Sequence, residues 1–176
     1  AAYQSFIEVG SLTIYPLFLI ERSGDVQMRR LDLRSDTFTL PTKEMLDSIP
    51  IADLGDDVEG EDPTVNQLQK MAADMFGTEG ALLVASGTMG NLVSLMAHCQ
   101  RGDEIIMEAQ AHIYYYELGG MSALVGAIPS LIPGTRGKFT PEQLESQIRH
   151  PDLHYPNTRL VCIENTHNRG GGTVWT

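Results

Sequence analysis

From residue 31 onward, apolar positions recur alternately at helical spacing and in short continuous runs, so the chain is predicted to alternate helices with strands. Helical spacing predicts helices over residues 64–76, 88–99, 114–123 and 140–150. Short apolar runs predict strands over residues 80–85, 104–108, 125–132 and 159–164. This alternation is typical of an α/β domain with a mostly parallel sheet and flanking helices.

Polar residues mark the ends of two predicted helices. Thr64 with Gln67, and Thr140 with Gln143, have the spacing of a capping box, in which two side chains satisfy backbone N–H groups at a helix start. Gly77 follows the first helix and is expected to end it. The faces expected to reach the core are Val65, Leu68, Ala72, Met75 and Phe76 on this helix, and Leu92, Leu95, Met96 and Cys99 on the next.

Residues 1–30 do not share the pattern. Their apolar stretch, residues 12–20, is nine residues long and contains Pro16, whereas a membrane helix needs about 20 apolar residues. A signal peptide would have a basic start and a cleavage site, and neither is evident. We therefore expect residues 1–30 to be an extension of unknown origin, residues 31–176 to form the domain, and the protein to be independent of membranes.

Composition narrows the functional class. The 176 residues are 42% hydrophobic and 20% charged, which is ordinary for a globular domain with a real core. The net charge of −11, without a basic patch, argues against a nucleic-acid partner. Cys99 and Cys162 lack metal-type spacing, so we expect two buried thiols in a reducing compartment, with a disulfide between them as the alternative.

In parallel sheets, ligands bind beyond the carboxyl ends of the strands, so the segments that follow the predicted strands are candidate sites. Residues 86–91 connect one such strand to a helix. The unpaired N–H groups of the helix start, the open backbone of Gly87, and the hydroxyls of Ser86 and Thr88 would suit a phosphate. An ordinary capped turn is the alternative. No lysine follows the glycine, so the segment is not a P-loop.

Three further segments carry polar chemistry. His112 follows the next predicted strand and could stack on a flat ring and transfer protons, or be a half-buried histidine satisfied by the backbone. Residues 164–172 end in three glycines and form either a ligand-facing turn or a flexible exposed loop. The acidic residues 55–63 do not match a calcium loop, so we expect a solvated loop and no metal.

Together, these segments resemble the L-threonine aldolase family over residues 31–176. Five motifs stand in that family's order and approximate spacing: Asp32-Leu33-Arg34-Ser35-Asp36-Thr37, Gly55-Asp56-Asp57 with Asp62-Pro63-Thr64, Ser86-Gly87-Thr88-Met89-Gly90-Asn91, His112, and Glu164-Asn165-Thr166-His167-Asn168. The resemblance implies a pyridoxal 5'-phosphate (PLP) enzyme of fold type I, here only the N-terminal part of the large domain. It implies a lyase that cleaves L-threonine or L-allo-threonine to glycine and acetaldehyde, in threonine catabolism and glycine biosynthesis.

The resemblance also assigns roles to single residues. Gly87 and Thr88 match positions that hold the PLP phosphate, and His112 matches a histidine stacked on the pyridine ring. Asn168 stands where related lyases place a group near the phenolic oxygen of the cofactor.

Two residues match substrate positions. Ser35 falls where the family contacts the substrate carboxylate, and His154 matches a second histidine that faces the substrate hydroxyl. His112 and His154 are thus the candidate catalytic residues, because a neutral histidine is a suitable base at neutral pH. The family also implies a cytoplasmic homotetramer that binds a small amino-acid substrate.

The chain departs from the family in two ways. Glu59 replaces a tyrosine of the family, and the cofactor lysine is expected beyond Thr176, since none of the lysines present has the matching context (Lys43, Lys70 and Lys138). We therefore expect these 176 residues to be inactive alone. The alternatives are a related PLP-dependent β-eliminating lyase and a non-catalytic truncated product.

Overall fold

The computed structural model describes residues 7–9, 12–14 and 35–176. The chain divides into two compact units, Ala1–Leu68 and Gln69–Thr176. In the first unit, β1 (Ile7–Val9) pairs with β2 (Leu12–Ile14) in antiparallel fashion. A short turn of 3-10 helix (Asp36–Phe38), helix α1 (Lys43–Ser48) and a second 3-10 turn (Ile49–Ile51) follow. The predicted motif residues 32–34 lie outside the described residues.

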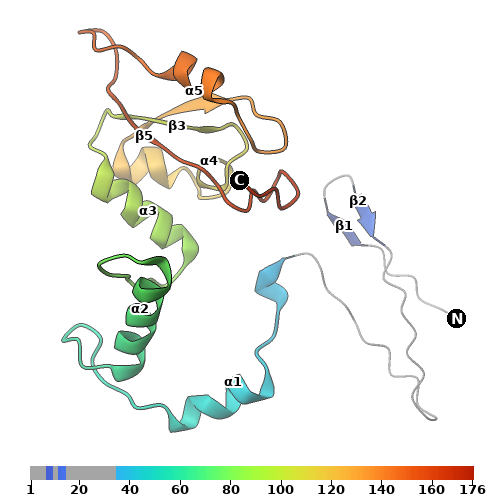
Figure 1. Ribbon diagram of the computed structural model, residues 1–176, viewed down its shortest axis with the longest axis vertical. Helices are drawn as coiled ribbons and strands as arrows, with labels where there is room; N and C mark the ends of the chain where they lie inside the picture. Colours follow the sequence, from blue (N-terminus) through green and yellow to red (C-terminus); the bar gives the residue numbers. More distant parts are fainter. Residues whose placement is uncertain (1–6, 10–11, 15–34) are drawn as a thin grey trace, which may run out of the picture. The chain divides into compact units, whose positions relative to one another are not determined.

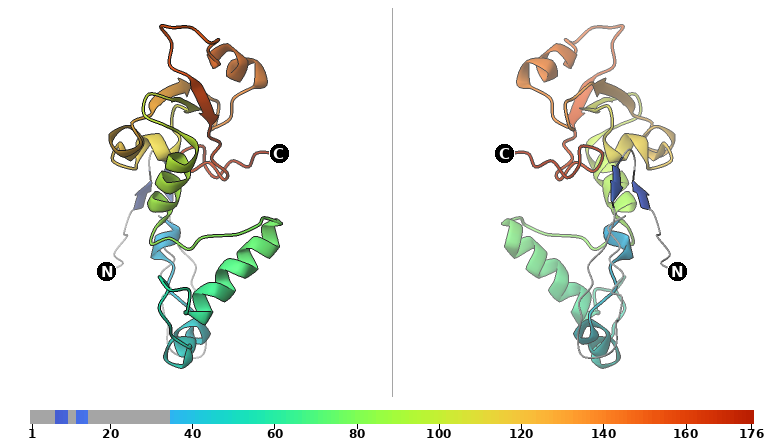
Figure 2. Two further views of the ribbon diagram at one scale, coloured as in Figure 1. Left: turned by 90° about the vertical axis from the view of Figure 1, so that its left-hand side faces the viewer. Right: turned by 90° about the vertical axis from the view of Figure 1, so that its right-hand side faces the viewer.

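Helix α2 (Pro63–Phe76), drawn in green in Figure 2, is the longest helix of the described residues. It ends as predicted, at Gly77 with φ +66°. The predicted capping box at Thr64 is wrong, because Pro63 is already the first helical residue. The cap is Asp62, whose Oδ1 accepts the backbone N–H groups of Thr64 and Val65, each at 2.9 Å.

The face of α2 that was expected to be buried is largely exposed. Leu68, Met75 and Phe76 are 50%, 77% and 78% exposed, and only Ala73 is buried. Helical spacing identifies an apolar stripe but not the element that would cover it, so this core prediction is wrong for α2.

The second unit is built on a parallel sheet with strand order β4-β3-β5, which confirms the predicted α/β class. The strands are β3 (Glu104–Glu108), β4 (Ile128–Ile132) and β5 (Thr158–Val161). Figure 1 shows helix α5 (Pro141–Gln147) on one side of this sheet and helix α3 (Gly87–His98) on the other.

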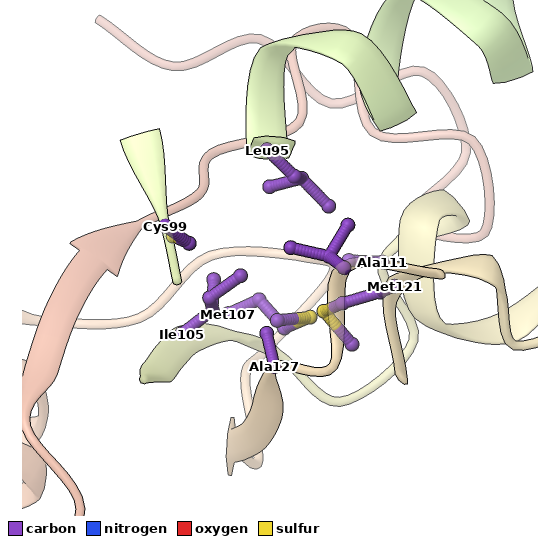
Figure 3. Packing of buried hydrophobic residues seen from close by; sticks show 8 residues of the cluster. Leu95, Cys99, Ile105, Met107, Ala111, Met121 and Ala127 are labelled. Carbon is purple, nitrogen blue, oxygen red and sulfur yellow. The ribbon is translucent and has the colours of Figure 1, made fainter. Parts of the chain in front are cut away.

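Strand β3 separates two hydrophobic clusters, because alternate side chains of a strand point to opposite faces. On one face, Ile105 and Met107 pack with α3 and with the π-helical segment η3 (Met121–Val125), and Figure 3 shows Met107 and Met121 pointing toward each other. On the other face, Ile106 packs with Ile132 and Phe139. All five residues of β3 are buried, as expected for a central strand between two helical layers.

Two predicted elements are wrong. Residues 80–85 are not a strand: Leu82 is 70% exposed, and the N–H of Leu83 bonds to the side chain of Gln69 at 2.9 Å instead of to a neighbouring strand. An apolar run alone does not supply a ladder partner. Residues 114–123 are not one helix, because Leu118 and Gly119 have φ of +53° and +69° and separate helix α4 (His112–Tyr115) from η3.

Other predicted elements are correct but shorter. The capping box of α5 is confirmed, with Thr140 N–H donating to Gln143 Oε1 at 2.8 Å and Gln143 N–H to Thr140 Oγ1 at 3.3 Å. The helix ends at Gln147, and β4 begins only at Ile128 because Gly126, at φ +75°, first reverses the chain. No helix in residues 7–9, 12–14 or 35–176 is long and apolar enough to cross a membrane.

Candidate functional site

The N-terminus of α3 is open, and some of its backbone N–H groups have no acceptor among the described residues. Ser86 caps the helix, and its Oγ accepts the N–H of Met89 at 3.1 Å. Within the described residues, no acceptor bonds to the backbone N–H of Gly87 or Thr88. A Cβ added at Gly87 would meet no heavy atom within 4 Å. Free N–H groups at the positive end of a helix dipole, beside an open glycine and the exposed Thr88, form a suitable site for an anion.

His112 is the first residue of α4 and follows the carboxyl end of β3. Its backbone N–H donates to Glu164 Oε2 at 2.6 Å, and Glu164 follows β5, the neighbouring strand. Two strands that are far apart in sequence therefore fix the position of this residue at one edge of the sheet.

The ring of His112 is fixed separately. Its Nδ1 lies 2.8 Å from Glu117 Oε1, and the same oxygen accepts the amide N–H of Asn91 on α3 at 2.7 Å. The Glu117 side chain is 6% exposed, whereas that of His112 is 41% exposed. The Tyr116 ring packs at a tilt against the His112 ring, with centroids 5.2 Å apart.

A cavity of about 430 Å³ opens beside these residues. Asn91 and His98 line it from α3, His112 from α4, and Cys162 and Glu164 from the end of β5 and the segment after it. Both cysteine thiols are free, so the disulfide alternative does not hold in this structure; Cys99 is buried as expected, whereas Cys162 is only partly buried. Burial, and to a smaller extent neighbouring Cys99, raises the pKa of the Cys162 thiol to about 11.

The segment after β5 is anchored. Glu164 Oε1 accepts the N–H of Asn168 at 2.7 Å. The ring of His167 is 1% exposed; its Nδ1 accepts the N–H of Gly170 at 3.0 Å, and its Nε2 lies 3.1 Å from Glu108 Oε2. These contacts order the turn and contradict the flexible loop that the sequence also allowed.

The structure brings together only part of the predicted set. His112 lines the cavity with Asn91 and Glu164, and Thr88 lies one turn earlier on α3, at the same end of the helix as Asn91. Asn168 is exposed, but its backbone is held by the same Glu164 carboxylate as His112.

His154 lies at the other end of the sheet, and Ser35 belongs to the other unit. His154 precedes β5, at the edge of the sheet where the strands begin, and its N–H bonds to Asp152 Oδ1 at 2.8 Å; it does not line the cavity with His112. Ser35 belongs to the first unit, where its Oγ accepts the hydroxyl of Thr37 at 2.9 Å.

The acidic loop of the first unit organises its own backbone. Asp56 Oδ1 accepts the N–H groups of Val58 and Glu59 at 2.8 Å and 3.3 Å, and Asp62 caps α2. Among the residues that the structure describes, no group of three or more His, Cys, Asp or Glu side chains could hold a metal ion.

Sequence reasoning missed Glu117, Glu164 and His167 as parts of this arrangement. Glu164 and His167 stand in one of the five motifs of the family resemblance but received no role, and Glu117 lies five residues after His112. The one available signal was an acidic residue close in sequence to a candidate histidine. That signal is weak, because the contact also needs the backbone reversal at Leu118.

The sequence of this chain matches a known protein family and several curated proteins. The profile of the family described as "Beta-eliminating lyase" matches residues 32–176. The chain is 47% identical to "Low-specificity L-threonine aldolase 1" of Arabidopsis thaliana over 149 residues, covering 82% of this chain and 42% of that protein. It is 43% identical to "Low specificity L-threonine aldolase" of Escherichia coli (strain K12), covering 78% and 42%.

A fungal relative is more distant. The chain is 36% identical to "Low specificity L-threonine aldolase" of Saccharomyces cerevisiae (strain ATCC 204508 / S288c), covering 77% of this chain and 36% of that protein. The chain thus spans about two fifths of the length of these curated relatives.

Proposed function

Because the chain belongs to the beta-eliminating lyase family, whose members have PLP fold type I, we propose that the protein is a carbon–carbon lyase of the threonine aldolase kind. Its reaction is the cleavage of L-threonine or L-allo-threonine to glycine and acetaldehyde. The names of the relatives support this choice of reaction. The observation that carries the proposal is the open N-terminus of α3 beside a cavity in which His112 is held by its backbone and its ring.

The residues present fit PLP. The free N–H groups of Gly87 and Thr88 with the Thr88 hydroxyl would hold the phosphate, and the open space at Gly87 allows its close approach. His112 would lie against the pyridine ring, and Asn168 near the phenolic oxygen. When bound, PLP supplies an electron sink for the carbanion that forms as the Cα–Cβ bond breaks.

His112 also has the geometry of a proton acceptor. Glu117 Oε1 accepts from Nδ2 of Asn91, a nitrogen that can only donate. This oxygen therefore acts as an acceptor, and the hydrogen of the His112 contact is on Nδ1. Nε2 of the neutral ring then has a free lone pair, which can take the β-hydroxyl proton of the substrate directly or through water.

The remaining assignments rest on the family resemblance. They are contact of Ser35 with the substrate carboxylate, contact of His154 with the substrate hydroxyl, assembly as a homotetramer, and residence in the cytoplasm. The position of His154 before β5 adds no support for a site shared with His112.

A related β-eliminating lyase is the second candidate, favoured by the description of the matching family profile. The two reactions give different products. The test is to incubate the protein at its native length with PLP and L-threonine, and to measure acetaldehyde and glycine. Equimolar release of the two supports the aldolase. A 2-oxo acid and ammonia, without acetaldehyde, would establish the β-eliminating reaction instead.

A further inference from the structure

We propose that Glu117 is a positioning residue, which fixes the tautomer of His112 and ties its ring to the phosphate-binding end of α3. This inference deepens the proposed function and rests on it for the role of His112. It starts from one carboxylate oxygen with two donors, His112 Nδ1 at 2.8 Å and Asn91 Nδ2 at 2.7 Å.

Burial makes this oxygen effective. The Glu117 side chain is 6% exposed, so water does not compete freely for its lone pairs. A buried acceptor that lost its donors would be costly, which favours the conformation in which both donors stay in place. The neutral His112 ring is therefore held as the Nδ1–H tautomer, with Nε2 as its basic atom.

The backbone is shaped to bring Glu117 inward. Helix α4 ends at Tyr115, and Leu118 then adopts φ +53°, a conformation that is unfavourable for a side chain with a Cβ. Leu118 itself is 100% exposed and contributes no packing. The hydrogen bonds of its neighbour Glu117 with His112 and Asn91 thus compensate for the unfavourable turn at Leu118.

Asn91 extends the effect to α3. It lies one helical turn after Gly87 and Thr88, which carry the free N–H groups of the proposed phosphate site. One oxygen thereby links the ring expected against the cofactor to the helix expected to hold its phosphate. Glu164 fixes the backbone N–H of His112 independently, so Glu117 governs only the rotation and tautomer of the ring.

The test uses histidine labelled with ¹⁵N in the protein at its native length, at pH 8.5, where an unperturbed imidazole is neutral. Long-range ¹H–¹⁵N spectra report which ring nitrogen carries hydrogen, and a His112→Gln variant assigns the His112 signals among those of the five histidines. We expect Nδ1 to be protonated in the wild type. Hydrogen on Nε2 with none on Nδ1 would overturn the proposal without any further variant.

Two variants separate positioning from folding. Glu117→Leu removes the acceptor and should shift His112 toward the Nε2–H tautomer, whereas Glu117→Gln keeps an acceptor oxygen and should preserve the wild-type pattern. Glu117→Leu should lower kcat for threonine cleavage by about 10- to 100-fold with little change in KM, and Glu117→Gln should restore most of it.

The outcomes distinguish the two proposals. If Glu117→Leu leaves the tautomer unchanged, the positioning role is wrong even when the protein cleaves threonine. If the tautomer follows the acceptor but the protein releases no acetaldehyde, the positioning role stands and the proposed reaction fails. If Glu117→Leu does not fold, the wild-type and Glu117→Gln spectra still decide the tautomer.

Discussion

His167 and Glu108 form a buried hydrogen bond between the segment after β5 and the end of β3, with His167 Nε2 donating to Glu108 Oε2 at 3.1 Å. The direction of this bond follows from the other ring nitrogen, since Nδ1 accepts the N–H of Gly170 and the proton is therefore on Nε2. The pair joins residues 59 positions apart and fixes the loop that carries Asn168.

His167→Leu should destabilise the protein strongly. It removes a donor to a buried carboxylate and leaves the N–H of Gly170 without its acceptor, which together should lower the free energy of unfolding by about 2–4 kcal/mol. Urea titration measures the change. The exposed His150 is the matched control, because His150→Leu should change stability by less than about 0.5 kcal/mol. Equal effects of the two variants would contradict a structural role for His167.

The close approach of Gly137 to this ring gives a second prediction. A Cβ at Gly137 would lie 2.1 Å from Cγ of His167, whereas a Cβ at Gly171 would meet nothing within 4 Å. Both glycines have positive φ, +80° and +82°. Gly171→Ala therefore measures the backbone cost alone, about 1–2 kcal/mol.

Gly137→Ala adds overpacking to that cost. We expect its free energy of unfolding to fall by about 1–3 kcal/mol more than that of Gly171→Ala in the same urea titration. Similar losses for the two variants would show that the His167 ring can move away from the new methyl group.

The sequence predicted the elements whose burial is decided locally. Glu104–Glu108 is a short apolar run that the sheet buries completely. On the predicted apolar face of residues 88–99, Leu95 and Cys99 are buried, but Met96 is 55% exposed, so this face is only partly correct. Prediction failed where a distant partner decides the outcome. Residues 80–85 are as apolar as β3 but have no strand to pair with among the described residues.

The candidate site was predictable in kind but not in its connections. The sequence alone placed Gly87 and Thr88 at the start of a helix, and His112 after the end of a strand. The bonds of Glu117 and Glu164 were not visible in the sequence, because they depend on a left-handed residue at Leu118 and on the adjacency of β3 and β5. Such contacts arise from topology rather than from spacing along the chain.

Cys162 should react slowly with alkylating reagents although it lines the cavity. Its pKa is raised from 9.0 to about 11, so the thiolate fraction at pH 8 is about 100-fold smaller than for an ordinary thiol. Iodoacetamide labelling followed by peptide mass spectrometry measures the rate. Urea-unfolded protein is the control, in which Cys162 should react at the normal rate. Equally fast labelling of the folded protein would contradict the raised pKa of Cys162.

Thr88→Val should weaken PLP binding without changing the fold. Valine has the shape of threonine but lacks the hydroxyl, and the loss of one hydrogen bond to a charged group is worth about 1.5–3 kcal/mol, or about 10- to 100-fold in Kd. Equilibrium dialysis against PLP at the native length of the protein measures the change. Thr88→Ser keeps the hydroxyl and should bind almost normally. Unchanged binding by Thr88→Val would place the phosphate elsewhere.

His112 and His154 should differ in their effect on the proposed reaction. His112→Phe keeps an aromatic ring against the cofactor but loses the basic Nε2, so kcat for threonine cleavage should fall by about 10²–10⁴-fold while PLP stays bound. The rate of acetaldehyde release from L-threonine, with PLP content measured on the same samples, separates the two effects. Unchanged turnover would reduce His112 to a stacking role.

His154→Phe in the same assay tests the role that the family resemblance gives to the second histidine. A loss of kcat comparable to that of His112→Phe would show that His154 reaches the substrate, although it precedes β5 and His112 follows β3. We expect the smaller effect, a loss of kcat below about tenfold, from His154→Phe. The two histidines stand at opposite ends of parallel strands, and a histidine outside the site contributes no proton transfer. The double variant adds a check, since independent residues should give multiplicative losses, whereas two histidines acting on one proton should give less.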